Sequence, residues 1–161
     1  MLDDAPRIAD VVIACWRYAY RGVLPDAVLD RDTRDERTTR IRRRIEDGWP
    51  TFVADTGQIV GMVRIGGTAP HGYDAEIEGL YVHPDAGRGG VGRALVREAC
   101  DYFATYGKRT LYIHTMRDNR IGRAFYAKLG GRVVVEDTWT YEGVAYPAVG
   151  YLWDDLRTLR D

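Results

Sequence analysis

The chain has 161 residues, of which 45% are hydrophobic and 29% charged, and it carries a formal net charge of -1 at pH 7. Its length suits one domain with a sizeable core, and its composition excludes an intrinsically disordered protein. Because 23 basic side chains balance 24 acidic ones, no overall charge favours a nucleic acid as partner. We therefore expect one folded domain over residues 1–161 that does not bind nucleic acid.

The sequence also argues against a membrane protein and a metal protein. It lacks a run of about 18 apolar residues, which a membrane-spanning helix requires. It begins Met-Leu-Asp-Asp, which is acidic where a signal peptide needs positive charge. We expect a cytoplasmic protein. Cys15 and Cys100 fall on the apolar sides of predicted helices and are interpreted as buried thiols, and no spacing of His, Cys, Asp and Glu predicts a metal site.

Two helices are predicted before the first strand. Apolar residues recur at helical spacing over residues 5–21, which predicts an amphipathic helix that ends before Gly22. Residues 30–47 combine many arginines with interleaved acidic residues, and we expect a second, mostly exposed helix. The arginines could bind a polyanion, but acidic partners three and four positions away favour a solvated helix face.

The rest of the chain alternates between strands and helices. Strands are predicted at 51–55 and 58–65 around a Thr56-Gly57 turn, then at 75–82, 110–114, 132–136 and 144–153. Helices are predicted at 91–106, where the apolar stripe is clearest, and at 119–129. This order predicts an α/β fold with one mixed, mostly antiparallel sheet flanked by helices.

Four glycines lie in the six-residue stretch Gly87-Arg88-Gly89-Gly90-Val91-Gly92, between a predicted strand and a strong helix. Glycine adopts positive φ at little cost and lets backbone N–H groups approach an anion. The stretch is therefore a candidate phosphate site. A P-loop is excluded, because Arg93-Ala94 stands where that motif needs lysine followed by serine or threonine.

A dinucleotide-binding motif, G-x-G-x-x-G, is literally present as Gly87, Gly89 and Gly92. That motif requires an acidic residue at the end of the next strand, for the ribose hydroxyl. Here the next strand ends in His114 and Thr115. The chain is also too short for a doubly wound sheet with a substrate domain, so we interpret the match as accidental.

Two segments resemble the GCN5-related N-acetyltransferases, the GNAT family. Residues 80–95, Leu-Tyr-Val-His-Pro-Asp followed by the glycine stretch, resemble its central motif. Residues 119–131, an asparagine followed by Phe-Tyr-x-x-x-Gly, resemble its next motif. The likeness covers most of the chain from Trp16 onward. It implies the GNAT fold, with the first family strand missing before the first helix, and acetyl-CoA as the co-substrate without a metal.

The resemblance also implies which residues bind the coenzyme. Strand backbone would hold the pantetheine arm and polarise the acetyl carbonyl, as an oxyanion hole does, and the glycine stretch would bind the pyrophosphate. The implied contacts are Leu80, Tyr81, Val82, Gly87, Arg88, Gly89, Gly90, Val91, Gly92, Arg93, Asn119 and Tyr126. The family pattern has Gln or Arg where Gly87 stands, one place before Arg88, so Arg88 either contacts the pyrophosphate or points to solvent.

Asn119 and Tyr126 are seven residues apart, which puts them on one face of a helix. The resemblance assigns Asn119 to the pantetheine and Tyr126 to the coenzyme sulfur, as general acid. The alternatives are a helix cap for Asn119 and a packed core position for Tyr126.

An amine with a pKa near ~10 needs a base before it can attack a thioester. Glu76 and Glu78 are the candidates, and strand alternation predicts that they share a face with Leu80 and Val82. Glu76 falls where some family members keep a catalytic glutamate. Each could instead be an ordinary strand residue facing solvent.

The acceptor side is less defined. Trp16, Tyr20, Trp139, Tyr141 and Tyr146 could line an acceptor pocket, but a core or dimer role is equally open for each. His83 and His114 are interpreted as ordinary polar strand ends.

The sequence therefore predicts an acetyltransferase that moves an acetyl group from acetyl-CoA to an amine of a small molecule or peptide by direct attack. The alternative is a non-catalytic acyl-CoA sensor, and a homodimer is left open.

Overall fold

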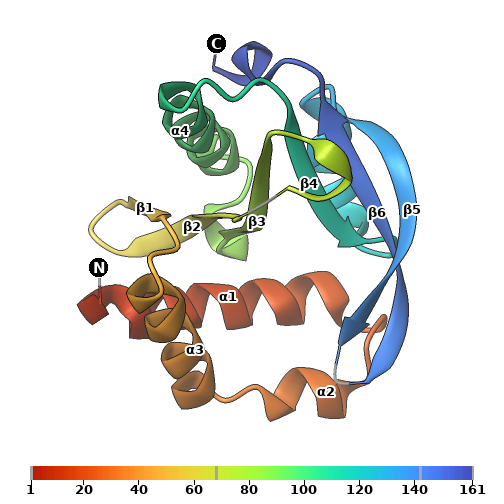
Figure 1. The fold of residues 1–161 in the computed structure, drawn as a ribbon. Coiled ribbons are helices and arrows are strands. Elements are labelled where there is room, and N and C mark those ends of the chain that lie inside the picture. Colours follow the sequence, from red (N-terminus) through yellow and green to blue (C-terminus); the bar gives the residue numbers. More distant parts are fainter. Residues whose placement is uncertain (1, 68, 142, 161) are drawn as a thin grey trace.

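The computed structural model describes residues 2–67, 69–141 and 143–160 (Figure 1). Residues 1, 68, 142 and 161, which the predicted domain includes, lie outside the described residues. The elements in chain order are α1 (Ala5–Tyr20), α2 (Asp26–Arg31), α3 (Arg34–Glu46), β1 (Thr51–Asp55), β2 (Ile59–Ile65), β3 (Ala75–Val82), α4 (Val91–Thr105), β4 (Leu111–Met116), α5 (Arg120–Lys128), β5 (Arg132–Tyr141) and β6 (Val144–Trp153). Short 3-10 turns include η2 (Pro70–Gly72) and η3 (Pro84–Ala86).

The described strands form one six-stranded sheet in the order β1-β2-β3-β4-β6-β5. Neighbouring strands are antiparallel except β3 and β4, which are parallel and are joined through α4. A parallel pair needs such a crossover connection, whereas the antiparallel pairs can be hairpins. The predicted α/β fold with a mixed, mostly antiparallel sheet is confirmed.

Helices cover both faces of the sheet (Figure 1). On one side, α4 and α5 pack on a core that includes Val63, Ile77 and Tyr151; we call this side the α4 face. On the other side, α1 and α3 pack on Met62 and its neighbours; we call it the α1 face. Burying each large apolar side chain stabilises the fold by about 1.5–3 kcal/mol, so both faces contribute to the core.

The helix predicted over residues 30–47 corresponds to α3 but begins later, and its first two predicted residues end a separate helix, α2, which was not predicted. α2 ends at Arg31 and α3 begins at Arg34. Thr33 caps α3: its hydroxyl accepts the backbone N–H of Glu36 at 3.3 Å, and the Glu36 carboxylate accepts the N–H of Thr33 at 3.2 Å. This reciprocal cap is a start signal within the arginine-rich run, and it outweighs the continuous helical periodicity.

The last hairpin is longer than the sequence predicts. β5 runs to Tyr141 rather than to Glu136, because it pairs with β6 as far as Tyr141 opposite Val144. Exposed, polar positions along β5 weaken its apolar alternation, and the partner strand holds them in the sheet.

Candidate active site

A gap opens between the two parallel strands in the centre of the sheet. β3 and β4 pair only from Ala75 opposite Leu111 to Ile77 opposite Ile113. Beyond Ile77 and Ile113 the two strands separate, and we call this point the fork. From there β3 continues to Val82 with β2 as its partner, and β4 continues to Met116 with β6. The second half of β3 therefore has one edge that is not paired with β4 in the described part of the chain.

Backbone groups of β3 point into this gap. The N–H of His83 donates to the carbonyl of Val60 at 2.8 Å, and hydrogen-bonded pairs alternate along an antiparallel ladder. With Val82 opposite Gly61 and Leu80 opposite Val63, the N–H and C=O groups of Leu80 and Val82 face away from β2 and toward the gap. Tyr81, in contrast, directs its backbone groups to β2.

The glycine stretch lies at the mouth of the same gap. Gly90 has a φ of 81° and precedes the first residue of α4, whose first-turn N–H groups at Val91 and Gly92 have no acceptor within the helix. A Cβ on Gly92 would lie 3.2 Å from the Phe125 ring of α5 and 3.6 Å from Val82. The glycine thus allows the close approach of α4, α5 and the end of β3, and a side chain there would press on the Phe125 ring.

Arg88 adopts positive φ, at 65°, and is exposed. Gly87 and Gly89, in contrast, lie outside the left-handed region, so the conformation that favours glycine falls on Arg88 and Gly90. A non-glycine residue there carries a conformational cost. Arg88 is therefore held at the mouth of the gap by a backbone conformation that costs an arginine more than a glycine.

Tyr126 of α5 is buried at 6% exposure between Phe125, Tyr151 and Trp153. Burial raises the pKa of its hydroxyl above the ordinary value for tyrosine, and the nearby hydroxyls of Tyr20 and Tyr81 act in the same direction. The hydroxyl is therefore protonated at neutral pH. Tyrosines from α1, β3 and α5 approach one another at the gap.

Asn119 caps α5 and ties it to the first helix. Its Oδ1 accepts the N–H of Gly122 at 2.9 Å, and its Nδ2 donates to the Tyr20 hydroxyl at 3.2 Å and to Thr115 Oγ1 at 3.1 Å. Both amide protons are thus engaged. The cap foreseen as the alternative for Asn119 is present, and only Oδ1 retains capacity for another donor. Nothing in the spacing of Tyr20 and Thr115 points to this network.

The predicted face of the two glutamates is wrong, because β3 contains a bulge. Arg64 lies opposite Gly79 and Ile65 lies opposite Ile77, so Glu78 is the extra residue. A bulge offsets the alternation of side chains along a strand. Leu80 and Val82 pack on the α4 face with Ile77. Glu76 and Glu78 lie on the α1 face, the side on which Tyr81 packs.

The surroundings of the two carboxylates differ. Glu78 is ion-paired with Arg64 of β2 and with Arg44 of α3, the latter at 3.4 Å. Glu76 has no cationic partner of this kind among the residues that the structure describes, and burial raises its pKa, with the neighbouring Glu78 acting in the same direction. Of the two, Glu76 is the better base near neutral pH.

Comparison with known proteins now identifies the family. The model of the "Acetyltransferase (GNAT) family" matches residues 9–131 of the 161. The chain belongs to the GNAT family. The predicted family and the predicted acetyltransferase activity class are confirmed.

Known GNAT relatives match over nearly their whole length. The uncharacterized N-acetyltransferase YuaI of Bacillus subtilis is 28% identical over 99% of this chain and 92% of its own. The PaiA N-acetyltransferase of Thermoplasma acidophilum, solved in complex with coenzyme A, has a TM-score of 0.71 at 18% identity and covers 92% of each chain. yncA of Salmonella typhimurium, solved with its cofactor acetyl-CoA, has a TM-score of 0.67 at 19% identity, covering 96% of this chain and 90% of its own. These two structural likenesses are likenesses of fold.

On the α1 face of this GNAT chain, the aromatic residues proposed for the acceptor pocket pack together; we call this cluster the aromatic wall. The Trp16 ring centroid lies 5.0 Å from that of Tyr20, 5.8 Å from that of Trp139 and 5.2 Å from that of Tyr141. Tyr146 packs against the same cluster. The wall joins α1 to the β5–β6 hairpin beside the gap.

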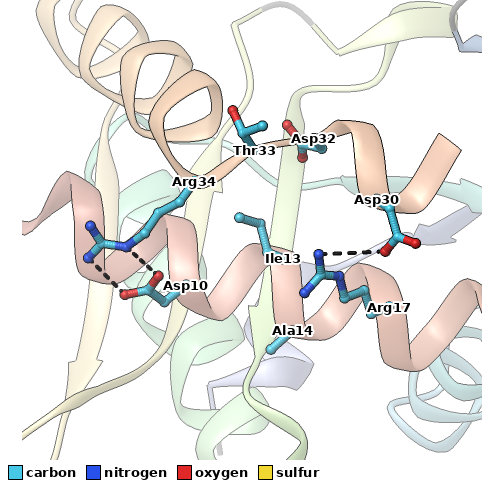
Figure 2. A pocket seen from close by; sticks show the side chains of 8 residues that line it. All are labelled: Asp10, Ile13, Ala14, Arg17, Asp30, Asp32, Thr33 and Arg34. Atoms are coloured by element: carbon cyan, nitrogen blue, oxygen red, sulfur yellow. Dashed lines mark hydrogen bonds and ion pairs between the residues drawn. The ribbon is translucent and has the colours of Figure 1, made fainter. Parts of the chain in front are cut away.

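A hollow of about 410 Å³ lies away from the gap between β3 and β4. Figure 2 shows it between α1 and the α2–α3 connection, with the Arg34–Asp10 and Arg17–Asp30 pairs on either side of Ile13. Its α1 residues are on the helix face opposite Cys15, whose thiol contacts Val82 of the gap. This hollow therefore faces away from the gap between β3 and β4 and from the candidate catalytic residues.

Among residues 2–67, 69–141 and 143–160, no group of three or more His, Cys, Asp or Glu side chains is arranged to hold a metal ion. In the same residues, no helix is long and apolar enough to cross a membrane.

Proposed function

We propose that this protein, as one catalytic domain over residues 1–161, transfers an acetyl group from acetyl-CoA to an amine by direct attack. The observation that carries the proposal is the arrangement around the gap. The glycine stretch and Tyr126 lie on the α4 face, and Glu76 lies on the α1 face beside the fork. A coenzyme and an amine entering from opposite faces would meet at the exposed edge of β3.

The donor would be held by main-chain groups. The free N–H groups at the start of α4 suit a pyrophosphate, because a helix N-terminus attracts anions. Leu80 and Val82 would bind the pantetheine arm, and a β3 N–H group would polarise the acetyl carbonyl as charge develops on its oxygen. Asn119 would contribute through Oδ1, since its amide protons are already engaged.

Three proton movements complete the reaction. Glu76, directly or through one water, takes a proton from the incoming ammonium group, and the neutral nitrogen attacks the thioester carbon. The tetrahedral intermediate then collapses, the carbon–sulfur bond breaks, and Tyr126 donates a proton to the leaving thiolate. Its burial keeps this proton in place until a thiolate forms. The second proton of the attacking nitrogen passes by way of water to the Tyr126 phenolate, which leaves the neutral amide product.

The protonation of the nearest thiol favours direct attack by the amine over a route in which a cysteine is acetylated first. Cys15 donates its S–H to the carbonyl of Val82 at 2.8 Å, and burial raises the pKa of Cys15 to about 12. A thiol that is protonated at neutral pH is a poor nucleophile. Cys100, the other cysteine, is a fully buried residue of α4.

The first experiment is a thiol-release assay with acetyl-CoA and a panel of amines that includes amino acids, peptides, polyamines and aminoglycosides. Acetyl transfer with at least one class is expected, together with a rise in Tm on adding acetyl-CoA. Intersecting double-reciprocal plots and the absence of an acetylated protein in intact-mass spectra would support direct attack. Tight coenzyme binding without turnover on any amine would instead favour the acyl-CoA sensor.

A further inference from the structure

The hollow beside Glu76 contains more titratable groups than one general base needs. It measures about 120 Å³ and is lined by Pro70 and His71 of η2, Glu76 of β3, Tyr112 and His114 of β4, and Asp137 of β5. Glu76 lies opposite Tyr112 in the parallel ladder. His114 follows Ile113, the last β4 residue paired with β3, so the hollow lies at the fork.

His114 has an unused polar atom at this place. Its Nε2 is buried and has no hydrogen-bond partner among the residues that the structure describes. A buried polar atom without a partner costs stability, so it calls for an explanation. His114 lines the hollow together with Glu76 and Asp137, so a water molecule in the hollow would link the imidazole to the Glu76 carboxylate.

The surroundings of the hollow bring the pKa values of Glu76 and His114 closer together. Burial raises the pKa of Glu76, and Glu78 on the same strand adds to this. Burial lowers the pKa of His114, His71 of η2 adds to this, and Asp137 of β5 opposes it. The remaining neighbours are Tyr112, whose pKa is raised by burial to about 12, and Tyr73, whose ring stacks on that of Tyr112. Groups with ordinary pKa values of about 4.3 and about 6.5 thereby become better matched for proton exchange.

We propose that His114 accepts, through water in the hollow, the proton that Glu76 has taken from the amine. The N–H bond of the ammonium group breaks and its proton goes to a Glu76 oxygen. The proton then moves by way of water to the His114 imidazole, and the imidazolium releases it to solvent beside Asp137, which is exposed on β5. No electrons are transferred, and Glu76 is restored for the next turnover. This inference rests on the proposed acetyl transfer.

Chemical rescue tests this role directly. His114→Ala should lower kcat/KM by about 10- to 100-fold, within the range of acid–base contributions, with an unchanged Kd for acetyl-CoA. Free imidazole should restore part of the rate in proportion to its concentration. His83→Ala removes a histidine outside the hollow and should show no rescue. Full activity of His114→Ala, or a loss that imidazole does not relieve, would overturn the proposal.

A second measurement needs no acceptor and no coenzyme. NMR titration of the His114 imidazole should show a lower pKa in Glu76→Gln than in the unmodified protein, because a nearby negative charge is removed. Glu78→Gln, whose carboxylate is paired with two arginines, is the matched control and should shift it less. Equal titration in all three proteins would overturn the link. If instead the unmodified protein transfers acetyl to no amine, the acetyl-transfer proposal fails by itself.

Discussion

The two sides of the gap are built in different ways. The α4 face takes its candidate residues from two short segments, residues 80–95 and 119–131, each of which carries a strand end or a helix start. The α1 face takes its residues from six places along the chain: α1, α3, η2, β3, β4 and the β5–β6 hairpin. The proposed coenzyme site is therefore built mainly from local motifs. The proposed acceptor site is a surface that the tertiary fold assembles from distant segments.

The sharpest test of this comparison is the pair of glutamates on the α1 face. Glu76→Gln should lower kcat/KM by about 10²- to 10⁴-fold, because a neutral amide cannot accept the amine proton. Glu78→Gln should have a much smaller effect, since Glu78 already neutralises Arg64 and Arg44. Steady-state kinetics of both variants decide the matter, and equal losses would remove Glu76 from its proposed role.

The pH dependence follows from the same group. The carboxylate form of Glu76 is the active base, and burial raises its pKa. The rate should therefore fall as the pH is lowered through a value above the ordinary ~4.3 of a glutamate. A profile of kcat/KM against pH measures this fall in rate at low pH, the acid limb of the profile. The acid limb should persist in Glu78→Gln. An acid limb at or below ~4.3 would contradict the assignment.

On the α4 face the largest effect is expected at Tyr126. Tyr126→Phe removes the proposed donor to the thiolate while keeping the packed ring, so kcat should fall by about 10- to 100-fold with an unchanged Kd for acetyl-CoA. Tyr106→Phe, at an exposed tyrosine of 64% exposure, is the control. Unchanged turnover with both variants would return Tyr126 to a core role.

A smaller effect should come from filling the glycine site. Gly92→Val places a branched side chain against Phe125, which an added Cβ would already approach to 3.2 Å. We expect the Kd for acetyl-CoA to rise about tenfold, or about 1.4 kcal/mol, and Gly92→Ala should lie between. Ala94→Val, on an exposed position of the same helix, controls for helix propensity. Calorimetric titration provides the affinities, and equal Kd values for Gly92→Val and Ala94→Val would argue against coenzyme approach there.

The smallest effect is expected at Arg88. If its side chain reaches the pyrophosphate, Arg88→Gln should weaken acetyl-CoA binding by about two- to fivefold, the size of an exposed charge contact, and the loss should shrink at high salt. Arg88→Gly should weaken binding similarly but raise thermal stability, because glycine tolerates the observed φ of 65°. Unchanged affinity in both variants would mean that Arg88 points to solvent.

The sequence alone determined the features that depend on local order. The glycine stretch before α4, the asparagine cap of α5 and the alternation of strands and helices follow from neighbouring residues, because turns, caps and periodicity are local. They were enough to predict the α/β fold and the GNAT family. The start of α3 was also encoded locally, by Thr33 and Glu36, but it was hidden by the periodicity of the arginine-rich run.

The composition of the two sides of the site depends on contacts between distant segments. The bulge at Glu78 arises from the pairing of β3 with β2, and it moves Glu76 and Glu78 to the face opposite Leu80 and Val82. The bond between Asn119 and Tyr20 spans 99 residues, and the hollow of Glu76, His114 and Asp137 joins three strands. Such contacts depend on strand register and on helix packing between distant segments, which no local pattern specifies.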